Sequence, residues 1–321
     1  MLGHHAAAAA SREGHDLVVT FRNLKSLEPL RHLKFDARHA DLNDRDELRA
    51  ALLGVDAVIN CAGYYPTVPR SWRDEVRTAT CQMDNFYSAC ADLPLRKIVY
   101  LGAAIALPRD PEGQPATEAL DYSGEPRDKN PYLQVKWALD VQARAKAKAG
   151  LPVTIAIPTM SFGEFDPGNT TGRFILETAN GTLPGYVNGR RNVIYAGDAG
   201  RGLVRVCEAG RLGERYLLSG ENLTMQQILS KIAEAAGSSI PRTIPLRAAK
   251  MLSAWQRVLY SLGGPVPKVS ASAIAVMSSG QFIDGTKASA ELDFTPQVSV
   301  NEAIKRALHW FQGQGLLKAA S

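Results

Sequence analysis

The chain has 321 residues, of which 45% are hydrophobic, so it can bury a large core in one large domain or two modest ones. The formal net charge is +5, but basic and acidic residues are interspersed and no Lys/Arg block carries interleaved aromatics, which excludes a nucleic-acid footprint. The four cysteines lack Cys-x-x-Cys spacing, and His4-His5 lacks partners at metal spacing. We therefore expect reduced thiols in a cytoplasmic protein and no metal site. No apolar run is long enough to span a membrane, and no signal peptide is evident.

The first half of the chain alternates short apolar segments with helical ones. The alanine-rich segment His4–Arg12 predicts a helix that stops at Gly14. The strands predicted after it are Asp16–Phe21, Ala37–Leu42, Asp56–Asn60, Lys97–Leu101 and Leu151–Ile157, and the helices are Arg45–Leu53, Trp72–Ala91 and Tyr132–Ala149. Strands that are apolar on both faces and alternate with helices predict an α/β fold with a doubly wound parallel sheet. The sites of such a sheet lie at the carboxyl ends of its strands.

The texture of the sequence changes after Pro158. Residues Thr159–Asn192 are rich in Gly, Thr and Asn, as expected of an insertion that faces a substrate. The strands Asn192–Tyr195 and Arg215–Leu218 are predicted to return to the main sheet. From Thr224 the chain is predicted to be mostly helical, and it ends with an amphipathic helix at Val300–Gln312.

A candidate catalytic pair opens one of the long helices. Tyr132 and Lys136 are four residues apart, so at helical pitch their side chains lie on the same face. A nearby ammonium favours the phenolate and brings its proton within reach of acid/base chemistry. Spacing alone favours the alternative, an aromatic core contact with a solvated lysine one turn on.

Other short motifs accompany this pair along the chain. They are Gly3 with the helix that follows, Ala62-Gly63 after a strand, Val99-Tyr100 before a loop, Ile157-Pro158 with Phe162-Gly163, the segment Gly213–Gly220, Phe294-Thr295-Pro296 and Trp310-Phe311. In this order and spacing, the chain resembles the extended short-chain dehydrogenase/reductase superfamily. Within it, the chain looks most like the NAD-dependent epimerase/dehydratase family of nucleoside-diphosphate-sugar epimerases and dihydroflavonol 4-reductase-like proteins.

The resemblance implies a fold and a set of roles. A Rossmann-type NAD(P)-binding domain would span residues 1–158, and a smaller, mostly helical substrate region would span residues 159–321. Tyr132 would exchange a proton with a substrate hydroxyl or carbonyl, and Lys136 would also bind the nicotinamide ribose. Pro158 would lie near the nicotinamide. Gly3 and Ala62-Gly63 would pass the phosphates and adenosine, although Ala62-Gly63 could also be an ordinary turn at the end of a strand.

Two further positions bear on the choice of cofactor. Arg22 follows a strand end where an acidic residue would bind the ribose 2′-hydroxyl and an arginine suits a 2′-phosphate, so NADP is predicted ahead of NAD. A solvated surface arginine is the alternative. Asp41-Leu42 resembles the pair that contacts adenine, but Asp41 could equally start a turn.

Two departures from the family pattern put activity in doubt. Ala103 stands where the resemblance implies a catalytic Ser or Thr, and no hydroxyl lies between Leu101 and Thr117. The second departure is that the first strand and the first two glycines of the glycine-rich loop are absent before Gly3. The natural start is therefore expected upstream of Met1. The sheet is expected to show either a gap at its centre or the strands Leu17–Phe21 and Ala57–Asn60 pushed into contact.

The sequence favours an NAD(P)-dependent enzyme that acts on a hydroxyl or carbonyl of a small molecule. A nucleotide sugar is the first candidate and a dihydroflavonol-like ketone the second, while Arg173, Arg190 and Arg191 could bind a diphosphate or be merely solvated. The alternative is a dinucleotide-binding sensor or interaction protein with little catalysis. A homodimer through Trp72–Ala91 and Tyr132–Ala149 is possible by analogy, and neither nucleic acid nor a membrane is expected as a partner.

Overall fold

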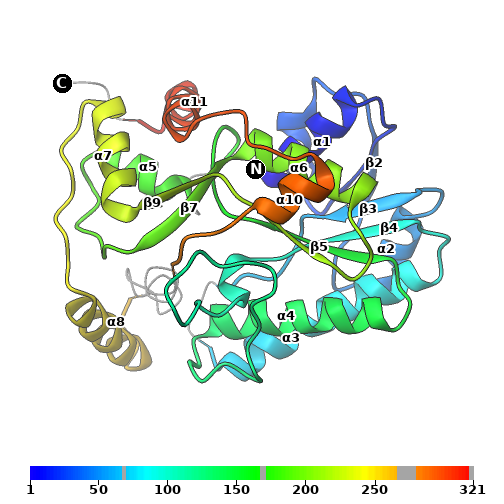
Figure 1. Cartoon of the computed structure of the whole chain (residues 1–321), viewed down its shortest axis with the longest axis horizontal. Helices are drawn as coiled ribbons and strands as arrows, with labels where there is room; N and C mark the ends of the chain where they lie inside the picture. Colours follow the sequence, from blue (N-terminus) through cyan, green and yellow to red (C-terminus); the bar gives the residue numbers. More distant parts are fainter. Residues whose placement is uncertain (67–69, 167–170, 266–279, 318–321) are drawn as a thin grey trace.

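The computed structural model describes residues 1–66, 70–166, 171–265 and 280–317 of the chain. A four-stranded parallel sheet forms its centre, with the strand order β3 (Ala57–Asn60), β4 (Lys97–Leu101), β5 (Val153–Pro158) and β8 (Arg215–Leu218). Helices α3 (Trp72–Ala91) and α4 (Pro131–Lys148) cover one face of the sheet, and α1 (Leu2–Arg12) and α6 (Ala196–Ala209) lie on the other (Figure 1). The predicted α/β class with a parallel sheet is confirmed.

Alternation along the strands gives the sheet a core on each face. In β4, Ile98 and Tyr100 face the cluster around Met83 and Leu139 under α3 and α4, whereas Val99 faces the cluster under α6. All three strand residues are buried, as expected of a central strand covered on both sides. This double burial explains why the strands read as continuous apolar runs in the sequence.

The first two strands form a sheet of their own. β1 (Val18–Phe21) pairs only with β2 (Asp36–His39), and no described strand lies in register between β1 and β3. Of the two arrangements expected, contact between β1 and β3 is therefore not observed, and the two strands belong to separate sheets. After β2, Asp44 caps α2 (Arg45–Ala51) as expected, because its carboxylate accepts hydrogen bonds from the backbone N–H groups of Asp46 and Glu47.

The second half of the chain adds a smaller layer. A three-stranded sheet, β6 (Met160–Phe162), β7 (Arg190–Tyr195) and β9 (Glu221–Thr224), packs against α5 (Gly172–Ala179), α7 (Met225–Ala236) and α11 (Val300–Gly313). Helix α8 (Leu246–Ser261) adjoins this layer, with Ala249 packed against Val187, whereas α10 (Thr286–Leu292) packs on β8 and α6 of the main sheet. The predicted return of β8 to the main sheet is confirmed. The same prediction for Asn192–Tyr195 is wrong, because that segment, as part of β7, pairs with β6 and with β9.

A buried ion pair ties α4 to β8. Arg215 donates from Nε to the Asp140 carboxylate at 3.1 Å, and its other nitrogens contact Asp140 and the carbonyl oxygens of Glu118 and Leu120. Arg144 donates a third bond to Asp140, at 3.0 Å. Such a pair adds little net stability over an apolar pair, but its directional bonds fix how a helix sits on a sheet. Here it holds the helix that begins with Tyr132.

Candidate active site

The predicted site residues converge on the carboxyl edge of the main sheet. Strands β3, β4 and β5 are parallel and in register, so their carboxyl ends meet at one edge. Ala62 and Gly63 follow β3, Ala103 follows β4, and Pro158 is the last residue of β5. Residues far apart in the sequence thus share one edge, as the resemblance implied.

Tyr132 and Lys136 lie in the first turns of α4 above this edge. The side chain of Asn130 caps the helix by accepting hydrogen bonds from the backbone N–H of Tyr132, at 3.0 Å, and of Leu133. Pro131 occupies the first turn, where its missing N–H costs nothing. The Lys136 Nζ lies 5.8 Å from the centroid of the Tyr132 ring. The predicted same-face arrangement is confirmed.

The electrostatic expectation for this pair needs correction. Burial raises the pKa of Tyr132 well above its ordinary value, and the neighbouring Tyr65 raises it further. Burial also lowers the pKa of Lys136, to about 8. Desolvation therefore outweighs the predicted stabilisation of the phenolate by the ammonium. Tyr132 holds its proton at neutral pH, so the phenol is an acid rather than a base.

Tyr65, which was not predicted from the sequence, lies beside Tyr132. The two ring centroids are 4.9 Å apart, and Tyr65 comes from the loop after β3 with 48% of its surface exposed. Burial of the rest of the side chain raises the pKa of Tyr65, so its hydroxyl is also a proton-bearing donor. The available signal was a tyrosine two residues after Ala62-Gly63, at a strand end already identified as part of the site.

Ala103 lies at the position where a hydroxyl was sought. It caps the short 3-10 helix Ala104–Ala106 without a side-chain hydrogen bond, and α4 packs against that turn. The preceding Gly102 is tightly enclosed, because a Cβ there would lie 3.0 Å from Ile157. The backbone therefore passes closely by Ile157 as it leaves β4, and the next residue, Ala103, has a methyl group in place of a hydroxyl.

The small residues near α1 fit a dinucleotide. A Cβ on Gly3 would lie 3.4 Å from the Cβ of Cys61, so the start of α1 packs closely on the end of β3. A Cβ on Gly63 would meet no atom within 4 Å, which leaves open space beside that backbone. The amide of Ala62 is held by the Asn60 side chain at 3.0 Å. An exposed, ordered backbone beside a helix N-terminus is the kind of surface that pyrophosphates approach.

The residue predicted to select the cofactor, Arg22, and the pair predicted to contact adenine, Asp41-Leu42, follow the strands of the separate β1–β2 sheet. Arg22 follows β1 and is exposed, with no hydrogen bond or ion pair to the described part of the chain. The Asp41 carboxylate accepts hydrogen bonds from the backbone and side chain of Asn43, at 2.9 and 2.8 Å, which is a turn. Leu42 packs against the core under α3 and α4, and its carbonyl accepts a bond from Asn85.

The three arginines considered for a diphosphate are engaged by the chain itself. Arg173 pairs with Glu177 at 2.7 Å. Arg190 donates to the carbonyl of Gly113 at 2.6 Å. Arg191 is buried and donates to the Arg190 carbonyl, and burial lowers the pKa of Arg191 to about 10. Residues 167–170 of the predicted substrate segment lie outside the described residues.

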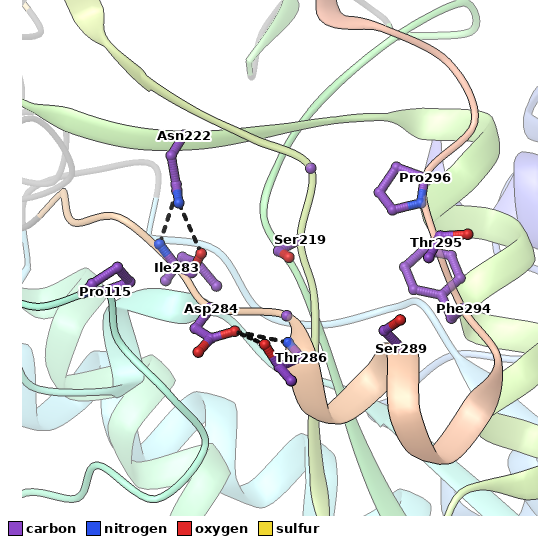
Figure 2. Close-up of a pocket in the computed structure, with 12 residues that line it drawn as sticks. Pro115, Ser219, Asn222, Ile283, Asp284, Thr286, Ser289, Phe294, Thr295 and Pro296 are labelled. Carbon is purple, nitrogen blue, oxygen red and sulfur yellow. Dashed lines mark hydrogen bonds between the residues drawn. The ribbon is translucent and has the colours of Figure 1, made fainter.

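A cavity of about 420 Å³ lies elsewhere, between the β8–β9 turn and the start of α10 (Figure 2). Five of its lining residues, Ser219, Gly220, Phe294, Thr295 and Pro296, belong to motifs noted in the sequence, but none of them was predicted to be a site residue. Several of its polar groups form hydrogen bonds with one another. Asn222 exchanges two hydrogen bonds with the backbone of Ile283, and the Asp284 carboxylate accepts hydrogen bonds from Thr286. These bonds hold the chain segments together, and they leave the edge around Tyr132 as the better candidate for chemistry.

Comparisons with known proteins agree with this geometry. A nucleoside-diphosphate-sugar epimerase from Pseudomonas aeruginosa has a solved structure that is 41% identical, with a TM-score of 0.83, over 99% of this chain and 96% of that one. A putative dihydroflavonol 4-reductase from Synechocystis is 28% identical over 95% of this chain and 90% of its own length. A dTDP-glucose 4,6-dehydratase from Streptomyces venezuelae, solved with NAD, shares the fold at 22% identity and a TM-score of 0.75, over 99% and 96% of the two chains. Residues 1–219 match the NAD dependent epimerase/dehydratase family, and the chain belongs to that family.

Proposed function

We propose that this protein is an NAD(P)-dependent oxidoreductase that interconverts a carbonyl and a hydroxyl on a small molecule, with Tyr132 as the proton donor. The observation that carries the proposal is the pair at the start of α4. Tyr132 is a protonated phenol at the carboxyl edge of a parallel sheet, and Lys136 lies over its ring. The family to which the chain belongs supports an enzyme of this kind.

The chain offers residues for each part of a dinucleotide. Gly3, Ala62 and Gly63 would bind the pyrophosphate and adenosine, because they lack bulk beside the start of α1. Lys136 and Pro158 would lie along the nicotinamide and its ribose, while Leu42 and Asp41 would flank the adenine. When bound in its reduced form, the nicotinamide supplies a hydride.

The protonation state of Tyr132 suits the role of a proton donor to a carbonyl oxygen. Tyr132 keeps its proton at neutral pH because burial raises its pKa. The phenol can therefore hydrogen-bond to a carbonyl oxygen and donate its proton as that oxygen gains negative charge. The Lys136 ammonium would stabilise the phenolate that remains, since it lies on the same face of the helix.

Tyr65 is the candidate for the second donor that Ala103 lacks. A carbonyl oxygen held by Tyr132 alone would be poorly oriented, and a second hydroxyl would fix its position. The Tyr65 ring is 4.9 Å from that of Tyr132 and is partly exposed, so a substrate can reach it. We place Tyr65 in this role because it bears a proton-carrying hydroxyl next to Tyr132.

Two substrate classes merit testing. A nucleotide sugar comes first, because the 41% identical solved structure carries that description. A dihydroflavonol-like ketone comes second, and one observation favours it. Arg173 and Arg190 bind a carboxylate and a carbonyl of the chain itself, so they would have to change partners to grip a diphosphate. A ketone without phosphate makes no such demand.

The test combines cofactor binding with turnover. NADPH and NADH are titrated by fluorescence, and the same preparation is assayed with a panel of nucleotide sugars, dihydroflavonols and steroid-like ketones. Tyr132→Phe is expected to lower turnover by about 10²–10⁴-fold, because it deletes the proton donor, while cofactor affinity stays within a few-fold. Lys136→Ala is expected to lower both turnover and cofactor affinity, since the lysine has two roles.

Two results would contradict the proposal. Full turnover by Tyr132→Phe would show that another group moves the proton. Tight binding of NADPH with no turnover on any substrate, in wild type and variants alike, would favour the alternative of a dinucleotide-binding sensor. An inactive Tyr132→Phe beside an active Trp137→Phe, which alters the same helix one residue past Lys136, would separate chemistry from folding.

A further inference from the structure

Helix α8 exposes an apolar stripe to solvent. Met251, Trp255, Val258 and Leu262 are 73%, 61%, 57% and 79% exposed. They are spaced four, three and four residues apart, so at 100° per residue they lie along one line on the helix and its C-terminal turn. The opposite side of α8 is the buried one, where Ala249 and Ser253 pack against the rest of the chain. This helix therefore hides small residues and presents its large apolar ones.

The stretch of sequence that contains α8 carries positive charge only. Between Glu234 and Asp284 the sequence has no acidic residue and five basic ones, namely Arg242, Arg247, Lys250, Arg257 and Lys268. The chain has 37 basic and 32 acidic residues, so these five account for the whole formal charge of +5 and the remainder is balanced. The charges that looked interspersed along the chain are thus not interspersed here. Arg242, Arg247 and Lys250 are exposed.

We propose that α8 docks this protein on an anionic lipid surface, with the stripe Met251–Leu262 in the headgroup and acyl boundary and the exposed Arg242, Arg247 and Lys250 against the lipid phosphates. Interfacial helices combine an apolar face containing Trp and Leu with flanking Lys or Arg. Tryptophan favours this depth because its ring is apolar and its N–H is polar. The absence of acids between Glu234 and Asp284 removes repulsion from an anionic leaflet.

A surface-bound helix differs from a spanning one. Among the described residues no helix is long and apolar enough to cross a membrane. The stripe covers about 16 Å along the helix axis at 1.5 Å per residue, which suits a helix lying in the plane of the interface. Figure 1 shows α8 at the periphery of the molecule, joined to α7 by an extended segment, so it can meet a flat surface.

The test is flotation of the purified full-length chain with vesicles. Phosphatidylcholine vesicles are compared with vesicles containing 30% phosphatidylglycerol, at low and high salt. We expect binding to the anionic vesicles, and loss of at least tenfold in the partition coefficient with Val258→Asp. Leu212→Asp is the matched control, because Leu212 is 56% exposed but lies outside α8. Lys250→Gln is expected to weaken binding by about fivefold, and high salt by more.

Three outcomes would overturn the proposal. The first is no binding of the wild-type chain to anionic vesicles. The second is equal loss in Val258→Asp and Leu212→Asp. The third is dissociation of a dimer by Val258→Asp in sedimentation velocity, which would make a second copy of the chain the occupant of the stripe. None of these measurements needs cofactor or substrate, so their result is independent of the proposed oxidoreductase activity.

Discussion

Tyr132 and Lys136 occupy one turn at the start of α4, and burial moves their pKa values in opposite directions. The pKa of the Tyr132 phenol is raised, and the pKa of the Lys136 ammonium is lowered, to about 8. Each group thereby disfavours its charged form, as expected where both lose water.

A hydroxyl introduced at Ala103 tests how complete this site is. Removing a donor to a developing oxyanion commonly lowers the rate by about 10²–10³-fold. If the site runs without a second donor, Ala103→Ser is expected to recover part of that factor in kcat, measured on any substrate the wild type turns over. If Tyr65 already fills the role, Ala103→Ser brings little gain and Tyr65→Phe lowers kcat instead. An unchanged kcat in both variants would show that a single donor suffices.

The exposed Arg22 gives a prediction about cofactor choice. A guanidinium that binds a ribose 2′-phosphate makes charge-assisted bonds, which are worth about 1.5–3 kcal/mol. Arg22→Asp is therefore expected to weaken the binding of NADPH by about 10–100-fold and to change the affinity for NADH by no more than a few-fold, as measured by fluorescence titration. The same loss for both cofactors would make Arg22 an ordinary surface charge.

At the scale of elements, α1 buries two histidines at its N-terminal end. His4 is 9% exposed and stacks on Phe165 at 3.6 Å between ring centroids, and its Nδ1 is buried without a hydrogen-bond partner. Burial lowers the pKa of His4 to about 3, with the neighbouring His5 and His32 adding repulsion. The helix start therefore holds a neutral imidazole across the physiological range.

This burial predicts a loss of stability in acid. As pH falls below 6.5 the unfolded chain binds a proton on His4, while the folded chain does not until about pH 3. Stability from this group is thus full above pH 6.5 and is lost between there and about pH 3. From pH 7 to 5 the free energy of unfolding should fall by about 2 kcal/mol.

Thermal melts of two variants isolate that effect. His4→Leu keeps the ring site apolar and cannot be protonated, so it should gain about 2 kcal/mol relative to wild type between pH 7 and 5. His309→Leu, at an exposed position on α11, serves as the control and should follow wild type. Parallel curves for wild type and His4→Leu would mean that His4 is solvated in solution.

At the scale of the whole molecule, the sheet is divided between two regions of unequal burial. Strands β1 and β2 contain no buried residue, whereas three of the five residues of β4 are buried. β1 has one partner strand, and β4 has two. The β1–β2 pair is therefore expected to open locally at a lower free-energy cost than β4.

Hydrogen exchange measures this difference directly. Amides of β1 should exchange at least ~10-fold faster than those of β4, because fewer buried contacts and one open strand edge oppose local opening. Addition of NADPH should slow amide exchange in β1 more than in β4, since Arg22 and Asp41 follow β1 and β2. Equal protection of both strands would show that β1 is as firmly held as the centre of the sheet.

The sequence alone predicted most elements of the first half of the chain and singled out the candidate pair Tyr132 and Lys136. Periodicity placed Trp72–Ala91, Lys97–Leu101 and Arg215–Leu218 at the residues where the structure has them, because these segments are long or strongly apolar and their neighbours break them cleanly. Spacing placed Tyr132 and Lys136 on one helical face, since the pitch of a helix is fixed by local geometry.

Tertiary structure decided what local pattern cannot carry. The partners of β7, the proximity of Tyr65 to Tyr132 and the engagement of Arg190 by Gly113 each join segments distant in the chain. The protonation of Tyr132 also depends on tertiary structure, because desolvation is set by everything packed around a group and not by the lysine one turn away. For the same reason the apolar stripe of α8 reads in the sequence as an ordinary amphipathic helix, and only packing shows that its large side chains face outward.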